Sequence, residues 1–218
     1  GVAQNGGEYI NRGVIYTFDT ATKAVKNLIE FNTSKGGSTP SGFLTLGSNG
    51  LLYGTTVEGG ADKKGVLYSV NPLTGEKKVL KDFLFSTGKG LNPKTKLVQA
   101  PDGKLWGVTA FGGSGNSGTI FTYDTAKKVI GWEYEFQGGS DGQVPYGNVV
   151  LDGKGNIYGT TFQGGVNNTG IFYKFNPSTR AFTKLFDFID TLTGSNPTGL
   201  LNLTKSGKVI GLTNYGGK

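Results

Sequence analysis

The side chains of this sequence that are best placed for acid–base chemistry are carboxylates in the longer connections between expected strands. They are Glu58, Asp62, Asp141 and Asp190. Two such acids could serve as the paired carboxylates of a glycoside hydrolase. The chain has no His and no Cys, which excludes an imidazole general base, a Ser-His-Asp triad, a cysteine nucleophile and disulfide bonds. A carboxylate-dependent carbohydrate-active enzyme is therefore an alternative, and we expect a protein without catalytic residues.

A second set of acids recurs once in each stretch of about 52 residues, always directly before a Phe. These acids are Glu30, Asp82, Glu135 and Asp187. A catalytic pair is usually unique, so we expect the recurring acids to accept hydrogen bonds from backbone or Thr groups. The Asp-Gly pairs are typical of tight turns and no EF-hand spacing is present. We predict no metal and no cofactor; a Ca²⁺ ion bound by oxygens in a central channel is the alternative.

The elements that position these acids are internal repeats. A glycine that mostly follows an aromatic or apolar residue falls at Gly1, Gly54, Gly107, Gly159 and Gly211, in steps of 53, 53, 52 and 52 residues. A double glycine, a further glycine and an Asx-type turn follow at matching distances in the complete copies. Self-similarity at a fixed period is the signature of a repeat architecture.

Each repeat contains four expected strands. The first is a short apolar run (residues 42–46, 96–100, 148–151 and 200–203), and the second contains the recurring glycine (residues 51–56, 104–109, 156–161 and 208–213). The third alternates: Val14, Tyr16 and Phe18 oppose Ile15 and Thr17, a pattern typical of a half-buried strand. The fourth ends at the recurring acid, and a Gly-x-x-Pro segment leads to the next repeat. No convincing helix interrupts the pattern.

Four short antiparallel strands at this period predict an all-β fold, a β-propeller of four-stranded blades. We expect one domain over residues 1–218, with units at about 1–53, 54–106, 107–158 and 159–211 and a closing strand at the C-terminus. The two ends could clasp into a four-bladed ring. The phrases GVAQNGG and GLTNYGG are the same element twice, however, which favours the alternative of a piece of a larger ring or array.

Blade geometry places the long loops on one face and the tight turns on the other. Binding residues usually lie on variable loops held by a rigid frame, and aromatic, amide and carboxylate groups suit a glycan or a polar peptide. The predicted ligand-binding residues are Tyr9, Asn11, Glu58, Asp62, Phe111, Asn116, Gln163, Asn167, Asn168 and Tyr215.

The net charge is +7, and 12 of the 22 basic residues lie in or beside the tight turns. Such a face could dock on an anionic glycan, but lysines more often keep turns and edges soluble. Nucleic-acid binding is not expected because Arg occurs only at Arg12 and Arg180. Membrane insertion is not expected either, since no run approaches roughly 18 apolar residues. The absence of an initiator Met suggests a processed or excised chain.

The order G-T-T-x-x-G-G, then G-x-x-Y/F and later G-x-x-P is similar to the tandem "GloVer" repeats of bacterial surface proteins, and it resembles kelch blades more distantly. The resemblance covers essentially the whole chain and departs from the pattern at residues 1–3 and 211–213. It implies a secreted or surface-anchored bacterial protein and carries over no catalytic residues. We therefore expect an extracellular binding or adhesion module for glycan or protein. A structural or assembly subunit that self-associates or continues in a longer array is the alternative.

Overall fold

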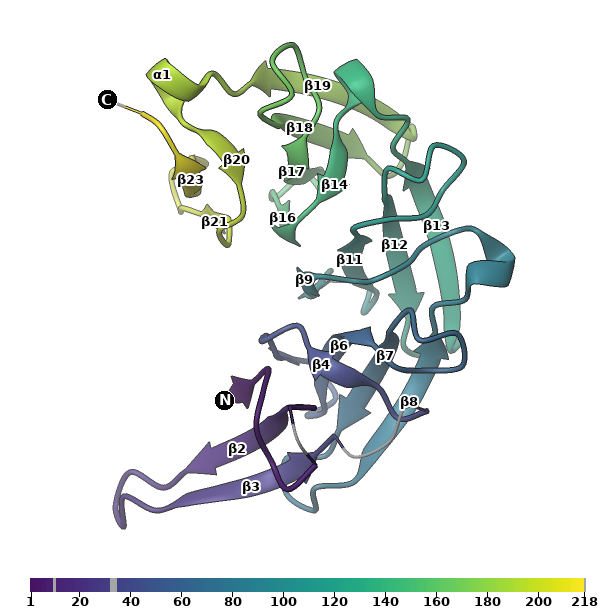
Figure 1. The fold of residues 1–218 in the computed structure, drawn as a ribbon, viewed down its shortest axis with the longest axis vertical. Coiled ribbons are helices and arrows are strands. Elements are labelled where there is room, and N and C mark those ends of the chain that lie inside the picture. The colour runs from purple at the N-terminus through teal and green to yellow at the C-terminus, as the bar shows by residue number, and fades with distance from the viewer. Residues whose placement is uncertain (10, 32–34, 218) are drawn as a thin grey trace.

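The computed structural model describes residues 1–9, 11–31 and 35–217 and forms an open arc of small antiparallel sheets (Figure 1). Within these ranges, helical segments are confined to three single turns, at Phe85–Thr87, Gly139–Asp141 and α1 (Asp190–Thr193). The predicted all-β class and the antiparallel four-stranded unit are confirmed.

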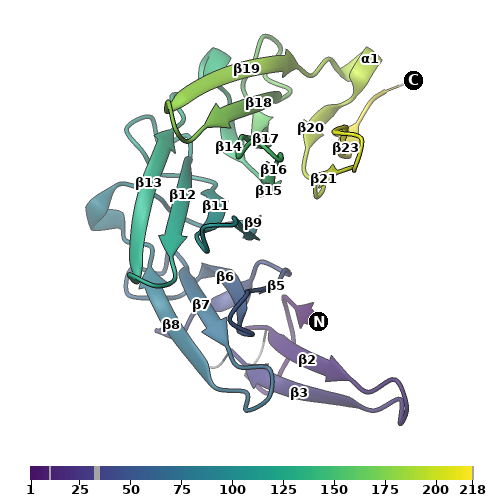
Figure 2. The ribbon, with the colours of Figure 1, turned by 180° about the vertical axis from the view of Figure 1, so that it is seen from behind.

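Successive sheets follow one another along the arc as blades, and we call the strand positions of a blade D, A, B and C from the concave to the convex edge. Viewed from behind, the C strands follow the convex edge (Figure 2). Blade 1 has β1 (Val2–Ala3), β2 (Val14–Phe18) and β3 (Val25–Glu30) at A, B and C. Blade 2 has β5 (Thr45–Leu46), β6 (Leu52–Glu58), β7 (Val66–Val70) and β8 (Lys77–Asp82). Blade 3 has β10 (Val98–Gln99), β11 (Leu105–Thr109), β12 (Thr119–Asp124) and β13 (Val129–Glu135).

Blade 4 has β16 (Val150–Leu151), β17 (Ile157–Gln163), β18 (Ile171–Asn176) and β19 (Ala181–Asp187). A half blade follows it, with β21 (Asn202–Leu203) at D and with β22 (Val209–Ile210) and β23 (Thr213–Tyr215) at A. The two ends of the arc lie on opposite sides of its opening (Figure 1). Among the described residues no strand of blade 1 pairs with β20 to β23, so the predicted ring closure is absent from this arrangement.

The Gly-x-x-Pro segment, expected as a plain connection, forms an additional short strand. It is β4 (Ser38–Pro40), β14 (Gln143–Pro145) and β20 (Ser195–Pro197). Each pairs with the outer half of an A strand, as in Ser38 with Glu58 and Pro40 with Thr56. Blade 3 has only a bridge between Leu91 and Phe111 there. β9 (Thr95–Lys96) and β15 (Gly147–Asn148) add a parallel link between neighbouring blades.

The core lies in the joints between blades. The Phe that ends one C strand meets the central aromatic of the next B strand edge to face: Phe31 with Tyr68, Phe83 with Phe121 and Phe136 with Tyr173, with ring centroids 5.2 to 5.4 Å apart. B strands between two blades are therefore buried on both faces, as β7 is along its whole length. The expected alternation holds in β18 but not in β2, where adjacent Val14 and Ile15 are both buried and Phe18 is 54% exposed.

The central aromatic of each B strand lies over the recurring glycine of the A strand beside it. A Cβ atom at Gly54 would lie 2.4 Å from the Tyr68 hydroxyl oxygen, and one at Gly159 would lie 2.2 Å from that of Tyr173. Gly107 has the same relation to Phe121, at 2.7 Å from its ring. The recurring glycine is therefore required for close packing and not for turn formation.

A left-handed residue also recurs at each joint, at the position before the Pro of Gly-x-x-Pro. These residues are Thr39, Asn92, Val144 and Asn196, with φ between 54° and 55°. Each N–H donates to a carbonyl of the preceding blade, as Val144 does to Ser117 at 2.9 Å. Asn92 and Asn196 also donate their amide nitrogens to the carbonyls of Val57 and Phe162. A β-branched residue is strained in this conformation.

We predict that Val144→Asn stabilises the protein, because Asn tolerates the left-handed conformation that costs most residues about 1 kcal/mol or more. The expected gain in the free energy of urea unfolding is about 1 kcal/mol. The reverse exchange, Asn92→Val, should destabilise the chain by at least as much. An unchanged or lower stability of Val144→Asn would contradict the strain argument.

Lys77 stands at a joint position where the other three blades have an apolar residue. Its place in β8 matches that of Phe182 in β19, whose ring packs on Phe136 and Tyr173. The Lys77 Nζ lies 4.4 Å from the centroid of the Phe31 ring and donates to the Gly36 carbonyl at 2.8 Å. Burial lowers the pKa of Lys77 from 10.5 to about 8.

This shift predicts a rise in stability in mildly alkaline solution. Between about pH 8 and pH 10.5 the unfolded chain holds a proton on Lys77 that the folded chain has lost, so stability increases with pH across that window. Lys77→Met should remove this increment, whereas Lys78→Met, at an exposed side chain, should keep it. Urea unfolding of the three proteins at the two ends of the window measures the difference, and equal slopes would refute the assignment.

Candidate functional site

The loops between A and B strands and the connections between blades share one face, which we call the long-loop face. The Gly113 N–H donates to the Gly88 carbonyl and the Gly165 N–H to the Gly139 carbonyl, both at 2.7 Å. On the opposite face the tight turns touch one another, as where the Asn176 amide donates to the Asn156 side-chain oxygen at 3.2 Å. The predicted separation of long loops from tight turns is therefore confirmed.

The recurring acids hold the long loops in place. In all four blades the carboxylate at the end of the C strand accepts the N–H that follows the double glycine. The contacts are Glu8 N to Glu30 Oε2 at 3.1 Å, Ala61 N to Asp82 Oδ1 at 2.8 Å, Ser114 N to Glu135 Oε2 at 2.9 Å and Val166 N to Asp187 Oδ1 at 3.0 Å. The prediction of a backbone-binding role for these acids is confirmed.

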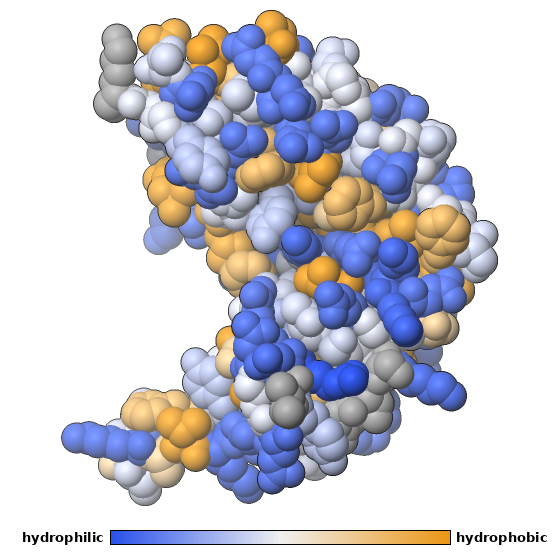
Figure 3. Space-filling model, in the orientation of Figure 1, coloured by the Kyte–Doolittle hydropathy of each residue, from blue (hydrophilic) through white to orange (hydrophobic). Residues whose placement is uncertain are grey.

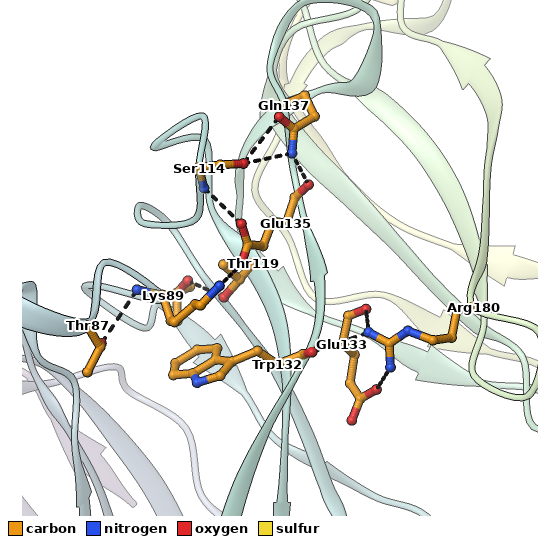
Figure 4. A network of polar contacts seen from close by, with 10 residues as sticks. Thr87, Lys89, Ser114, Thr119, Trp132, Glu133, Glu135, Gln137 and Arg180 are labelled. Atoms are coloured by element: carbon orange, nitrogen blue, oxygen red, sulfur yellow. Dashed lines mark hydrogen bonds and ion pairs between the residues drawn. The ribbon is translucent and has the colours of Figure 1, made fainter.

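In blade 3 this carboxylate belongs to a larger polar network (Figure 4). Lys89, from the connection out of blade 2, forms an ion pair with Glu135 at 2.7 Å, and the Gln137 amide donates to the hydroxyl of Ser114 at 3.2 Å. The hydrogen bonds from Lys89 and then from the Ser114 N–H lower the pKa of Glu135. Lower on the same strand Arg180, from a tight turn of blade 4, binds Glu133 at 3.0 Å. Arg180, one of the basic residues beside the tight turns, therefore joins two blades.

Several predicted ligand residues have a role inside the loops. Asn11, Asn116 and Asn168 are left-handed, at the same loop position as Lys63. The Asn116 and Asn168 side-chain oxygens accept the N–H groups of Gly112 and Gly164, at 3.0 and 2.9 Å. These two amides shape the backbone of the loop.

Three other predicted residues also make internal contacts. Asp62 accepts the N–H of Phe85 at 2.8 Å. Gln163, half-buried, accepts a bond from the Gln143 amide at 3.3 Å. The Glu58 carboxylate accepts a bond from the Thr39 hydroxyl at 3.3 Å.

The remaining predicted residues are solvent-exposed. Phe111 is 40% exposed, Tyr9 is 48% exposed and Tyr215 is 64% exposed; Asn167 is exposed as well. They lie on loops or A-strand ends of different blades, spread along the arc, and none of them lines the hollows described below.

One hollow does bring predicted residues together, between blades 1 and 2. It has a volume of about 740 Å³, and its lining includes Asn11 and Glu58 with Arg12, Lys63 and Lys64. The three cations were not among the predicted residues. Arg12 and Lys64 could have been found from their place directly before a recurring glycine, where the other blades have Ser117 and Thr169. Because its lining holds one carboxylate and three cationic side chains, the hollow is suited to an anionic or polyhydroxyl group.

The four candidate catalytic acids each have different partners. Glu58 lines the hollow and Asp62 holds a neighbouring connection. Asp141 accepts the hydroxyl of Tyr134 at 2.7 Å, and burial together with this bond raises the pKa of Tyr134. Asp190 accepts the hydroxyl of Ser195 at 3.0 Å. Among the described residues, no group of three or more acid, His or Cys side chains could hold a metal ion, and no helix is long and apolar enough to cross a membrane.

Removal of one loop carboxylate tests its role. Asp82→Ala should lower the free energy of unfolding by about 1.5 to 3 kcal/mol, because a charge-assisted hydrogen bond to the backbone is lost. The amide of Ala61 should also exchange with solvent faster. Glu76→Ala, which removes an exposed ion pair with Lys78, should cost less than about 1 kcal/mol. Equal effects of the two variants would exclude the loop-holding role.

Comparison with solved structures identifies the fold as propeller-like. The arc is similar to a chain in a crystal structure of a nidogen/laminin complex (TM-score 0.63, 12% identity, 93% of this chain and 65% of that one). It is also similar to a putative 6-phosphogluconolactonase from Bacteroides uniformis (TM-score 0.58, 17% identity, 100% of this chain and 64% of that one). A third similar structure is TolB from Acinetobacter baumannii (TM-score 0.55, 15% identity, 97% of this chain and 51% of that one). The chain thus spans between about half and two thirds of the length of these structures.

No curated protein matches the sequence. A family model does, and its match covers residues 1–218, including every repeat that the structure shows as a blade. The chain therefore belongs to the Gloeobacter/Verrucomicrobia repeat family.

Proposed function

We propose that this chain is a non-enzymatic binding or adhesion module of the extracellular space or cell surface, with its ligand site on the long-loop face. The observation that carries the proposal is the carboxylate that holds each long loop by its backbone. Because the backbone is fixed by residues that every blade shares, the residues that differ between blades are free to meet a ligand. A rigid frame with variable loops is the usual arrangement of a binding scaffold.

A glycan is the ligand that these loops suit best. Phe111, Tyr9 and Tyr215 offer exposed aromatic faces for stacking on sugar rings. The hollow between blades 1 and 2 adds Asn11 and Glu58 for hydroxyl groups, with Arg12, Lys63 and Lys64 for an acidic substituent. A protein ligand with acidic side chains is the alternative partner at the same face.

The location outside the cell rests on the family and on composition. Membership of a repeat family that resembles bacterial surface proteins supports it, as does the absence of Cys, which fits many such proteins.

A glycan array tests the ligand proposal. We expect saturable binding that is strongest for acidic glycans, and a loss of roughly tenfold or more in affinity on Phe111→Ala, Tyr215→Ala or Arg12→Ala, as expected when an anchor worth about 1.4 kcal/mol or more is removed. Leu73→Ala, at an exposed residue on the tight-turn face, is the matched control and should bind normally.

Two results would overturn the proposal. If no glycan on the array and no acidic protein binds to the chain, the proposed binding function is wrong. Turnover of any polysaccharide that is lost on Glu58→Gln or Asp141→Asn would replace it with the carboxylate-dependent enzyme.

A further inference from the structure

The hollow between blades 1 and 2 adjoins a second, smaller hollow of about 290 Å³. Thr39 and Glu58 line both, so the two hollows meet at this pair of residues. We call the first the outer hollow, the second the inner hollow and the two together the joint groove. Figure 3 shows hydrophilic side chains gathered over the region where blades 1 and 2 meet. One elongated ligand can therefore occupy both hollows.

The residues directly after the Pro of Gly-x-x-Pro line the inner hollow. They come from three successive joints and are Ser41, Lys94 and Tyr146. The chain enters the D strand soon after this position, as it does at β5 after Ser41, so the inner hollow lies toward the concave edge of the arc. Phe43 and Val57 add apolar surface, and the Lys94 Nζ lies 5.4 Å from the centroid of the Tyr146 ring. The inner hollow therefore combines apolar and aromatic surface with one ammonium group.

The joint groove contains cationic side chains that no carboxylate neutralises. None of the ion pairs in the described ranges involves Arg12, Lys63, Lys64 or Lys94. The same ranges contain no ion pair of Glu58, which lines both hollows. Four cations and one carboxylate leave the groove with an excess of positive charge, which favours an anionic ligand.

The frame that the blades share uses the backbone of these cationic residues. The Arg12 and Lys64 carbonyls accept the N–H groups of left-handed residues in the connections that follow, at 3.1 and 2.8 Å. The carbonyls of Ser117 and Thr169 do the same at the later joints, at 2.9 and 2.8 Å. Lys63 has a left-handed position that holds Asn in the other three blades. The positive charge at the first joint is therefore additional to what the fold requires.

We propose that the joint groove binds a linear acidic oligosaccharide. The ring of one sugar lies in the inner hollow, and the carboxylate of the adjoining sugar lies in the outer hollow. A neutral glycan suits the groove less well, because it offers no charge to the unpaired cations. Both the class of ligand and its place rest on the proposed glycan-binding function of the long-loop face.

The lining of the groove matches the parts of such a ligand. Phe43 and Tyr146 offer aromatic surface in the inner hollow for the apolar face of a sugar ring. Arg12 can bind a carboxylate through two parallel hydrogen bonds, and the two lysines of the outer hollow add their charge. Glu58 accepts hydroxyl groups where the sugar chain passes from one hollow to the other.

Calorimetric titration with oligogalacturonate, a linear chain of uronic acids, gives the first test. We expect saturable binding that weakens as salt is added, because ions screen exposed charges. The fully methyl-esterified oligomer has the same sugars without the charge and should bind at least roughly tenfold more weakly. Equal binding of the two oligomers, or binding of neither, overturns the proposal. Tighter binding of a sulfated oligosaccharide would overturn the assignment to a carboxylate.

Exchanges for residues that other blades carry give the second test, because such exchanges keep the frame. Lys63→Asn combined with Lys64→Thr alters the outer hollow, and Lys94→Thr alters the inner hollow. Each should weaken oligogalacturonate binding roughly tenfold or more and leave urea unfolding nearly unchanged. Lys23→Asn combined with Lys128→Asn is the matched control, at exposed left-handed positions of the tight turns, and should bind normally.

The outcomes separate this proposal from the proposed function. If the outer exchange weakens binding and Lys94→Thr does not, the ligand does not reach the inner hollow and the two-hollow groove is wrong. If the glycan array gives a ligand that depends on Phe111 and is insensitive to both exchanges, the binding module stands and the joint groove is wrong. If no glycan and no acidic protein binds, both proposals are wrong.

Discussion

Every joint in this protein depends on an aromatic ring that lies where a glycine leaves room for it. The ring of Tyr68, Phe121 or Tyr173 lies over the A-strand glycine of its own blade and meets the Phe that ends the previous blade. The Tyr68 and Tyr173 hydroxyls are buried without a hydrogen-bond partner among the described residues, and Phe121 has no hydroxyl at all. The joint therefore depends on the volume of the ring. In two of the three joints the ring also buries an unpaired hydroxyl, at a cost in the free energy of folding.

This packing explains how a chain with so much glycine becomes a rigid frame. The recurring glycines allow rings and backbones to come close, and the recurring carboxylates then fix the loops that leave the blade. Arg180 and Lys89 link neighbouring blades across the surface. The side chains that vary between blades are therefore few and lie on one face. The proposed ligand site consists of these loop residues and includes no core residue.

Much of the fold could be predicted from the sequence because repetition separates structural residues from variable ones. The strands, the two faces and the backbone role of Glu30 and its counterparts followed from their recurrence. The strand at Gly-x-x-Pro could not be foreseen, because Pro weakens a strand prediction and its partner lies some 20 residues away.

The candidate site was harder to predict. Asn116 and Asn168 look like ligand residues by type, and only the geometry shows their oxygens bound to the loop. The variation of Arg12 and Lys64 between copies is visible in the sequence, but their grouping in one hollow is not, because the hollow lies between two blades. Contacts between repeats depend on the curvature of the arc, and a period in the sequence does not specify curvature.

The nearest-neighbour character of the joints has a consequence for how the protein unfolds. Because each blade packs only on the blades beside it, the total stability approximates a sum of blade terms and joint terms, as in other repeat proteins. A terminal unit has one joint where an internal unit has two. Within residues 1–218, blades 2 to 4 each have a neighbour on both sides, so they are the part of this stretch that unfolds last.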